Sequence, residues 1–282
     1  MFGAALIVFR ESLEAALFVG IIAAATRGLP GRARWLSGGI AAGSLGALTL
    51  ALMADRVSAW ADGIGQDLLN VAILSIALTM LIWHCVWVST HGREMASDAR
   101  RLGASVQHGQ RPPWALFVAV ALAVLREGAE TVLFVAGYLT GSGQAGSSGM
   151  LLGSGLGLAA GVATGGLMYA GLSRIPAQRL FAVTNVLIAL LAAAIASQLA
   201  RALAQAGLVD RWSTPLWDSS GFVDGSSALG AALRALVGYD ARPSGLQLVC
   251  YIGVLMIIVF GTRILGRSFA ASAHRAPTAH AR

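Results

Sequence analysis

Seven stretches of about 20 mostly apolar residues divide this chain, and each is long enough to cross a hydrocarbon layer about 30 Å thick. No water reaches the backbone inside such a layer, so each stretch must form a helix whose N–H and C=O groups pair within the segment. The stretches are Phe2–Thr26, Leu36–Ala54, Leu68–Thr90, Trp114–Thr140, Gly149–Leu172, Leu180–Ala204 and Leu246–Leu265. The pattern predicts an all-α, polytopic membrane protein with seven transmembrane helices in a single transmembrane domain.

The composition agrees with a membrane protein. Of the 282 residues, 56% are hydrophobic and only 12% are charged, whereas soluble domains carry about 25% charged residues. The net charge of +7 does not indicate a nucleic-acid partner, because the sequence lacks a basic stripe interleaved with aromatic residues. The two cysteines, Cys85 and Cys250, lie inside apolar stretches, where a cysteine is usually a small packing residue.

Arginine residues gather in alternate links between the stretches. They follow the first, third and fifth stretches and recur in the tail: Arg27, Arg32, Arg34, Arg93, Arg100, Arg101, Arg111, Arg174, Arg179, Arg263, Arg267, Arg275 and Arg282. The intervening links Asp55–Asp67 and Gly141–Ser148 are poor in arginine. The positive-inside rule then places the N-terminus outside and the C-terminus in the cytoplasm. We expect a multi-pass protein of the inner (cytoplasmic) membrane, surrounded by lipid.

Two copies of one short charged pattern interrupt the first and fourth stretches. They are Arg10-Glu11-Ser12-Leu13-Glu14 and Arg126-Glu127-Gly128-Ala129-Glu130, which lie 116 residues apart and contain four of the chain's five glutamates. A charged side chain near the bilayer centre costs about 2.5–3.5 kcal/mol on insertion scales, so such residues persist only where they meet one another, water or an ion. One copy could join two helices as a plain salt bridge. Two copies, each with a glutamate beyond the pair, indicate a functional site.

The spacing of the two copies predicts an internal repeat. The first repeat covers about 1–92 and the second about 113–207, followed by an outer loop and seventh helix at about 208–267 and a short cytoplasmic tail at 268–282. Because each repeat holds three helices, the second is inverted relative to the first, as in many secondary transporters. Glu11 would lie about 13 Å along the first helix and Glu127 about 20 Å along the fourth. The two motifs can therefore face each other near the bilayer middle.

The motif spacing suits a cation site. Residues three and four apart share a helix face, so both glutamates of a copy project the same way and each arginine can pair with the second glutamate. Four carboxylates and two guanidinium groups give a formal charge of −2, which a divalent cation would neutralise. Adjacent carboxylates hold protons when no ion is bound, so we expect cation entry and proton release to be linked. Oxygen ligands without His or Cys favour hard cations and leave iron, manganese, magnesium and calcium open.

Five further residues are weaker candidates for accessory roles. His84 and His91 are seven apart on the third helix and could form a station on the exit side, although a lone His near a membrane surface is more often solvated. Asp62 and Asp67 could gather cations outside, although a solvated acidic loop is the simpler interpretation. Asp218 belongs to the long link Arg201–Gly245, which we expect to fold over the outer mouth or to receive a partner protein.

The sequence resembles the oxidase-dependent iron permease family, which includes fungal high-affinity iron permeases and bacterial EfeU-type transporters. The family motif Arg-Glu-x-x-Glu in the first and fourth membrane helices matches Arg10–Glu14 and Arg126–Glu130. The C-terminal third is similar to the bacterial members at Pro215-Leu216-Trp217-Asp218-Ser219-Ser220, Gly238-Tyr239, Arg242-Pro243-Ser244 and Gln247. The resemblance therefore covers essentially the whole chain.

This resemblance implies uptake of iron, with Glu11, Glu14, Glu127 and Glu130 as ligands and Arg10 and Arg126 as their supports. Iron would be the transported substrate, ferric or oxidised from ferrous at the outer mouth, and no tightly bound cofactor is expected. A separate iron-oxidising or iron-delivering protein outside the membrane is implied. Three alternatives stay open from the sequence: a permease for another cation such as lead or manganese, an intramembrane metal redox enzyme, and an assembly or receptor subunit.

Overall fold

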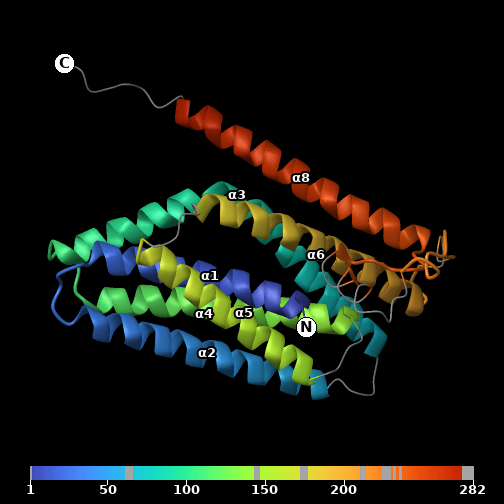
Figure 1. Cartoon of the computed structure of the whole chain (residues 1–282), viewed down its shortest axis with the longest axis horizontal. Helices are drawn as coiled ribbons and strands as arrows, with labels where there is room; N and C mark the ends of the chain where they lie inside the picture. Colours follow the sequence, from blue (N-terminus) through green and yellow to red (C-terminus); the bar gives the residue numbers. More distant parts are fainter. Residues whose placement is uncertain are drawn as a thin grey trace.

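Long helices make up almost all of the regular structure that is described for this chain (Figure 1). A computed structural model describes residues 2–60, 66–142, 147–171, 177–209, 212, 214–223, 230, 233–234 and 237–274, without the side chains of 54–60, 88–95 and 265–274 and a few others. The helices in these ranges are α1 (Phe2–Ala25), α2 (Arg32–Trp60), α3 (Gln66–Gln107), α4 (Trp114–Ser142), α5 (Ser147–Tyr169), α6 (Ala177–Gln205) and α8 (Gly245–His274). Each predicted apolar stretch coincides with one of these helices to within a few residues at most ends.

Five of these helices contain a segment long and apolar enough to cross a membrane: α2, α3, α5, α6 and α8. The other two, α1 and α4, each carry one arginine and two glutamates within their apolar sequence. The chain is therefore an all-α, multi-pass membrane protein. The charged residues that distinguish α1 and α4 from the rest are those of the two repeated motifs.

The third helix is longer than the sequence predicts. We expected it to end near Thr90 and to be followed by an arginine-rich link, but α3 continues for 42 residues to Gln107. The added turns have an apolar face, on which Ala99 and Val106 are buried against Ile22 and other residues of α1, α2 and α4. Burial of this apolar face stabilises the helix beyond Thr90, even though the opposite face carries charged residues.

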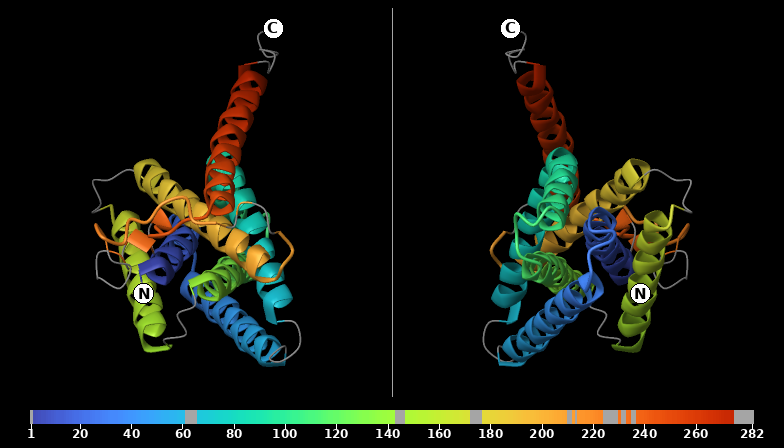
Figure 2. Two further views of the ribbon diagram at one scale, coloured as in Figure 1. Left: turned by 90° about the vertical axis from the view of Figure 1, so that its right-hand side faces the viewer. Right: turned by 90° about the vertical axis from the view of Figure 1, so that its left-hand side faces the viewer.

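The two helices that carry the charged motifs each pack most extensively against one other helix: α1 lies along α5, and α4 lies along α2 (Figures 1 and 2). Small residues allow this close approach between membrane helices. A Cβ atom on Gly43 would lie 2.7 Å from the carbonyl oxygen of Ala121, and one on Gly157 would collide with that of Ala5. Ala5 and Ala121 are separated by 116 residues, the same offset as the two motifs.

The last helix leans away from the others. Figure 2 shows α8 projecting from the bundle, which it touches through α3 and α6. Its remaining face carries exposed apolar side chains such as Ile257, Phe260 and Ile264, which suit contact with lipid. On the side facing the bundle, Val254 and Ile258 join an apolar cluster that also contains the buried, free Cys85 of α3.

The described part of the long link between α6 and α8 folds back along itself (Figure 1). The backbone N–H of Leu216 donates to Pro243 O at 2.9 Å, and that of Ser219 donates to Ala241 O at 2.9 Å. Gly238 has a φ of 71° and packs directly on Ala194 of α6, a conformation and a contact that only glycine accommodates readily.

Candidate metal site

The motif on α1 is buried and internally paired. Arg10 Nη1 lies 2.8 Å from Glu11 Oε1, and Arg10 Nη2 lies 2.7 Å from Glu14 Oε1. The second of these is the (i, i+4) pair that the sequence predicts. Arg10 is 1% exposed and Glu11 is fully buried. One guanidinium thus serves both carboxylates of its own motif, in surroundings without solvent.

The motif on α4 is paired in the predicted way but is more open. Arg126 Nε lies 2.9 Å from Glu130 Oε1 and 3.8 Å from Glu127 Oε1, and the Arg126 side chain is 39% exposed. Its guanidinium also lies over the ring of Trp87, 5.0 Å from the centroid. Arg126 and Glu130 help to line a cavity of about 240 Å³ between α3 and α4, together with Met80, Trp83, His84 and Trp87. The two motifs therefore differ in exposure: the motif on α1 is enclosed, whereas the motif on α4 borders a cavity.

Carboxylates from the two motifs meet in the interior. One oxygen each from Glu11, Glu127 and Glu130 lies within 4.8 Å of the other two, and all three residues are buried. Oε2 of Glu11 and Oε2 of Glu127 are buried and have no hydrogen-bond partner among the described residues. A buried carboxylate oxygen without a donor is costly, so this arrangement suits a site that a cation completes.

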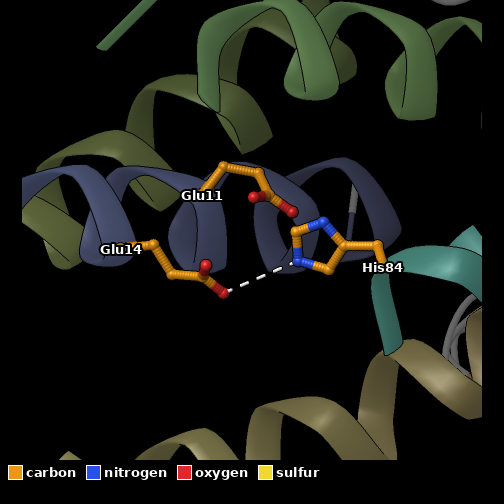
Figure 3. Close-up of side chains that lie close together, drawn as sticks. All are labelled: Glu11, Glu14 and His84. Carbon is orange, nitrogen blue, oxygen red and sulfur yellow. Dashed lines mark ion pairs between the residues drawn. The ribbon is translucent and has the colours of Figure 1, made fainter. Parts of the chain in front are cut away.

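A histidine from α3 lies between the two motifs. His84 Nδ1 is in contact with Glu130 Oε2, and its Nε2 lies 3.8 Å from Glu14 Oε1. Figure 3 shows Glu11 and Glu14 pointing from α1 toward this ring, which comes from α3. Ligand atoms of Glu11, Glu14 and His84 also lie within 4.8 Å of one another. Three helices, α1, α3 and α4, therefore build the cluster.

This position of His84 corrects two expectations. We grouped His84 with His91 near the exit and considered the cluster to contain only oxygen ligands, whereas His84 is 3% exposed and lies inside the cluster. A lone histidine in an apolar helix gives a weak sequence signal, since the sequence does not say which face of α3 meets α1 and α4. A stronger signal was its position inside an apolar stretch, where a solvated role is unavailable.

The other accessory candidates lie apart from this cluster or outside the description. Asp67 is exposed in the first turn of α3. Asp62 and the side chain of His91 fall outside the described residues. Asp218 is exposed and pairs with Arg242 Nη2 at 2.9 Å. Hydrogen bonds from the hydroxyl and backbone N–H of Ser220, followed by the Arg242 charge, lower the pKa of Asp218. These contacts give Asp218 a structural role in the link between α6 and α8.

The chain is similar to known proteins along nearly its whole length. The model of the Iron permease FTR1 family matches residues 1–271. Among curated proteins, "Ferrous iron permease EfeU" of Escherichia coli O6:H1 (strain CFT073) is 32% identical over 250 residues, which cover 86% of this chain and 88% of that protein. "Ferrous iron permease EfeU" of Yersinia pestis is 27% identical over 255 residues, 89% of each chain. No solved structure matches the chain. The extent of the family match shows that this protein belongs to the Iron permease FTR1 family, whose members are transporters and not enzymes.

Proposed function

We propose that this protein takes up iron across the cytoplasmic membrane through a site formed by Glu11, Glu14, Glu127 and Glu130. The observation that carries the proposal is the meeting of buried carboxylates from two separate motifs, with oxygens of Glu11 and Glu127 that lack a donor. Membership of an iron permease family and relatives named as ferrous iron permeases support iron as the substrate.

The proposed architecture has seven transmembrane helices arranged as two inverted repeats, α1–α3 and α4–α6, with α8 as an addition. The reciprocal packing of α1 on α5 and α4 on α2 supports it. The glycine contacts support it further, since Gly157 faces Ala5 and Gly43 faces Ala121 at equivalent positions of α1 and α4. In such transporters the substrate binds at the interface of the repeats near the midplane.

We propose that the N-terminus faces the outside and the C-terminus the cytoplasm. The exposed Arg100 and Arg101 on the extended end of α3, together with Arg27 after α1, support this orientation through the positive-inside rule. Iron would then enter at the end of the bundle where α1 begins. We propose that the link between α6 and α8, with its exposed Trp217 and Phe222, meets a separate iron-delivering protein there.

The charge of the cluster suits one divalent ion. Glu11, Glu14, Glu127 and Glu130 contribute −4 when ionised, and Arg10 and Arg126 contribute +2. The resulting charge of −2 is neutralised by Fe²⁺, whereas Fe³⁺ would leave +1 inside a medium where net charge is costly. We therefore propose that iron occupies the site in the ferrous state.

Iron uptake into proteoliposomes tests the proposal. We expect Glu14→Gln and Glu130→Gln to lower the initial rate at least about tenfold, because each removes a charged ligand and leaves its arginine with only the other glutamate of the motif. Asp98→Asn is a matched control, since Asp98 is an exposed acidic residue of α3 outside the cluster. Wild-type uptake rates in both glutamate variants would refute the assignment of these ligands.

A further inference from the structure

His84 has an unusual pair of environments at its two ring nitrogens. Nδ1 is in contact with Glu130 Oε2 from the second motif. Nε2 is buried, has no hydrogen-bond partner among the described residues, and lies 3.8 Å from Glu14 Oε1 of the first motif, beyond hydrogen-bond length. Nδ1 is thus held by Glu130, whereas Nε2 makes only a longer ion-pair contact with Glu14.

That arrangement matches the way proteins orient a metal-binding imidazole. Histidine ligands commonly donate the N–H of one ring nitrogen to a carboxylate, which fixes the tautomer and leaves the lone pair of the other nitrogen for the metal. In the neutral ring, Glu130 as acceptor places the proton on Nδ1. Nε2 then has its lone pair on the side of Glu14, to which Figure 3 joins it by a dashed line, with Glu11 on the neighbouring turn of α1.

Glu11 belongs to two groups of ligand atoms. It lies with Glu127 and Glu130 in an all-carboxylate group and with Glu14 and His84 in a mixed group, and the ligand atoms within each group are at most 4.8 Å apart. Two ligands about 2.1 Å from one cation are about 3.0 Å apart when adjacent and about 4.2 Å apart when opposite. Small side-chain movements therefore suffice to close either group around an ion.

We propose that the site offers two alternative positions to a single divalent ion, an all-carboxylate position at Glu11, Glu127 and Glu130 and a mixed position at Glu11, Glu14 and His84 Nε2. This inference rests on the proposed function and adds a nitrogen ligand and a second position to it. The cluster charge of −2 matches one divalent ion at a time. Transfer between the positions keeps Glu11 bound while the remaining ligands exchange.

The nitrogen ligand also sets the class of cation. Imidazole favours Fe²⁺, Co²⁺ and Zn²⁺, whereas sites with only carboxylates suit Mg²⁺, Ca²⁺ and Mn²⁺. The mixed position thus separates borderline transition-metal ions from the abundant hard ions that the carboxylates alone would accept. His84 is on this account the residue that determines specificity.

X-ray absorption at the iron edge tests the nitrogen ligand directly. The sample is the full-length, tag-free protein loaded anaerobically with one equivalent of Fe²⁺. We expect outer-shell scattering from an imidazole ring in the wild type and in His108→Gln, whose ring is exposed and contacts only the nearby Ala104 O in the described structure. His84→Gln should still bind one Fe²⁺, about tenfold more weakly, with oxygen scattering only.

Competition and a second variant test the two positions. Mg²⁺ should displace iron poorly from the wild type and at least about tenfold better from His84→Gln, because the variant lacks the nitrogen ligand that favours Fe²⁺ over Mg²⁺. Glu127→Gln should retain iron with imidazole scattering, because the mixed position remains.

Several results would overturn this inference while leaving the proposed function intact. They are iron bound by the wild type without imidazole scattering, imidazole scattering that persists in His84→Gln, and complete loss of iron binding in both His84→Gln and Glu127→Gln. Even if a variant fails to fold, the wild-type spectrum shows whether an imidazole ring binds the iron. Absence of iron binding by the wild type would instead refute the proposed function itself.

Discussion

The guanidinium of Arg126 lies over the ring of Trp87, 5.0 Å from its centroid, while its Nε pairs with Glu130 at 2.9 Å. The equivalent Arg10 has both of its terminal nitrogens on carboxylates of its own motif. The aromatic ring thus draws Arg126 toward the cavity wall, so that it does not enclose Glu127 as closely as Arg10 encloses Glu11.

Replacing Trp87 should therefore weaken iron binding. A cation–π contact at a partly exposed site contributes about 0.5–1 kcal/mol, and without it the guanidinium is free to move onto Glu127 and compete with the ion. We expect Trp87→Leu to raise the Kd for Fe²⁺ about two- to fivefold in an anaerobic titration. Trp83→Leu is the control, because Trp83 lines the same cavity and is 69% exposed. Equal effects of the two substitutions would contradict the role of the Trp87 contact.

The two arginines should differ in their importance for stability. Removing Arg10 leaves two buried carboxylates without their partner, a kind of change that costs about 3–5 kcal/mol. Arg126 is 39% exposed and its pair is partly screened, so its removal costs about 1 kcal/mol. In detergent, we expect Arg10→Met to lower the Tm well beyond the shift caused by Arg126→Met. Similar Tm values for the two variants would show that burial does not distinguish the motifs.

The packing of α5 on α1 depends on glycine at particular positions. A methyl group at Gly157 would collide with Ala5 O, so Gly157→Ala should destabilise the protein by about 1–3 kcal/mol. Gly155 lies two residues away on the same helix with nothing within 4 Å of the position of a Cβ atom, so Gly155→Ala should be neutral or stabilising. Thermal unfolding of the two variants measures the contrast. Equal loss of stability in both would argue against close packing of α5 on α1.

The link between α6 and α8 should loosen in acid. Hydrogen bonds from Ser220 and the charge of Arg242 lower the pKa of Asp218, so its ionised form stabilises the folded link above the ordinary aspartate pKa. This contribution is lost as the pH falls through the depressed pKa. Hydrogen exchange of residues 214–223 should be faster in Asp218→Asn than in the wild type at pH 6, and the difference should shrink below about pH 4. If the difference in exchange rate did not depend on pH, the charge of Asp218 would not be what stabilises the link.

The sequence was sufficient for the features that depend on local pattern. Apolar stretches located the helices, and the spacing of Arg10 and Glu14 within one helix predicted their pairing. The length of α3 could not be predicted, because the turns after Thr90 are helical through burial of Ala99 and Val106 against other helices. The position of His84 likewise depends on how α3 is rotated relative to α1 and α4. A local sequence pattern does not predict that rotation.

The unexpected length of α3 connects the interior of the bundle to the end at which α1 finishes, which is the cytoplasmic end in the proposed orientation. This helix contacts α1, α4, α6 and α8, and its far end packs beside the end of α1, where Gln107 Nε2 donates to Arg27 O at 3.2 Å. Gln107 lies about 35 Å beyond His84 along a continuous helix, so a displacement of about 3 Å at that end corresponds to a tilt of about 5° at the imidazole. Contacts made at this end of α3 can thus change the separation between His84 and the glutamates without any change in the motifs themselves.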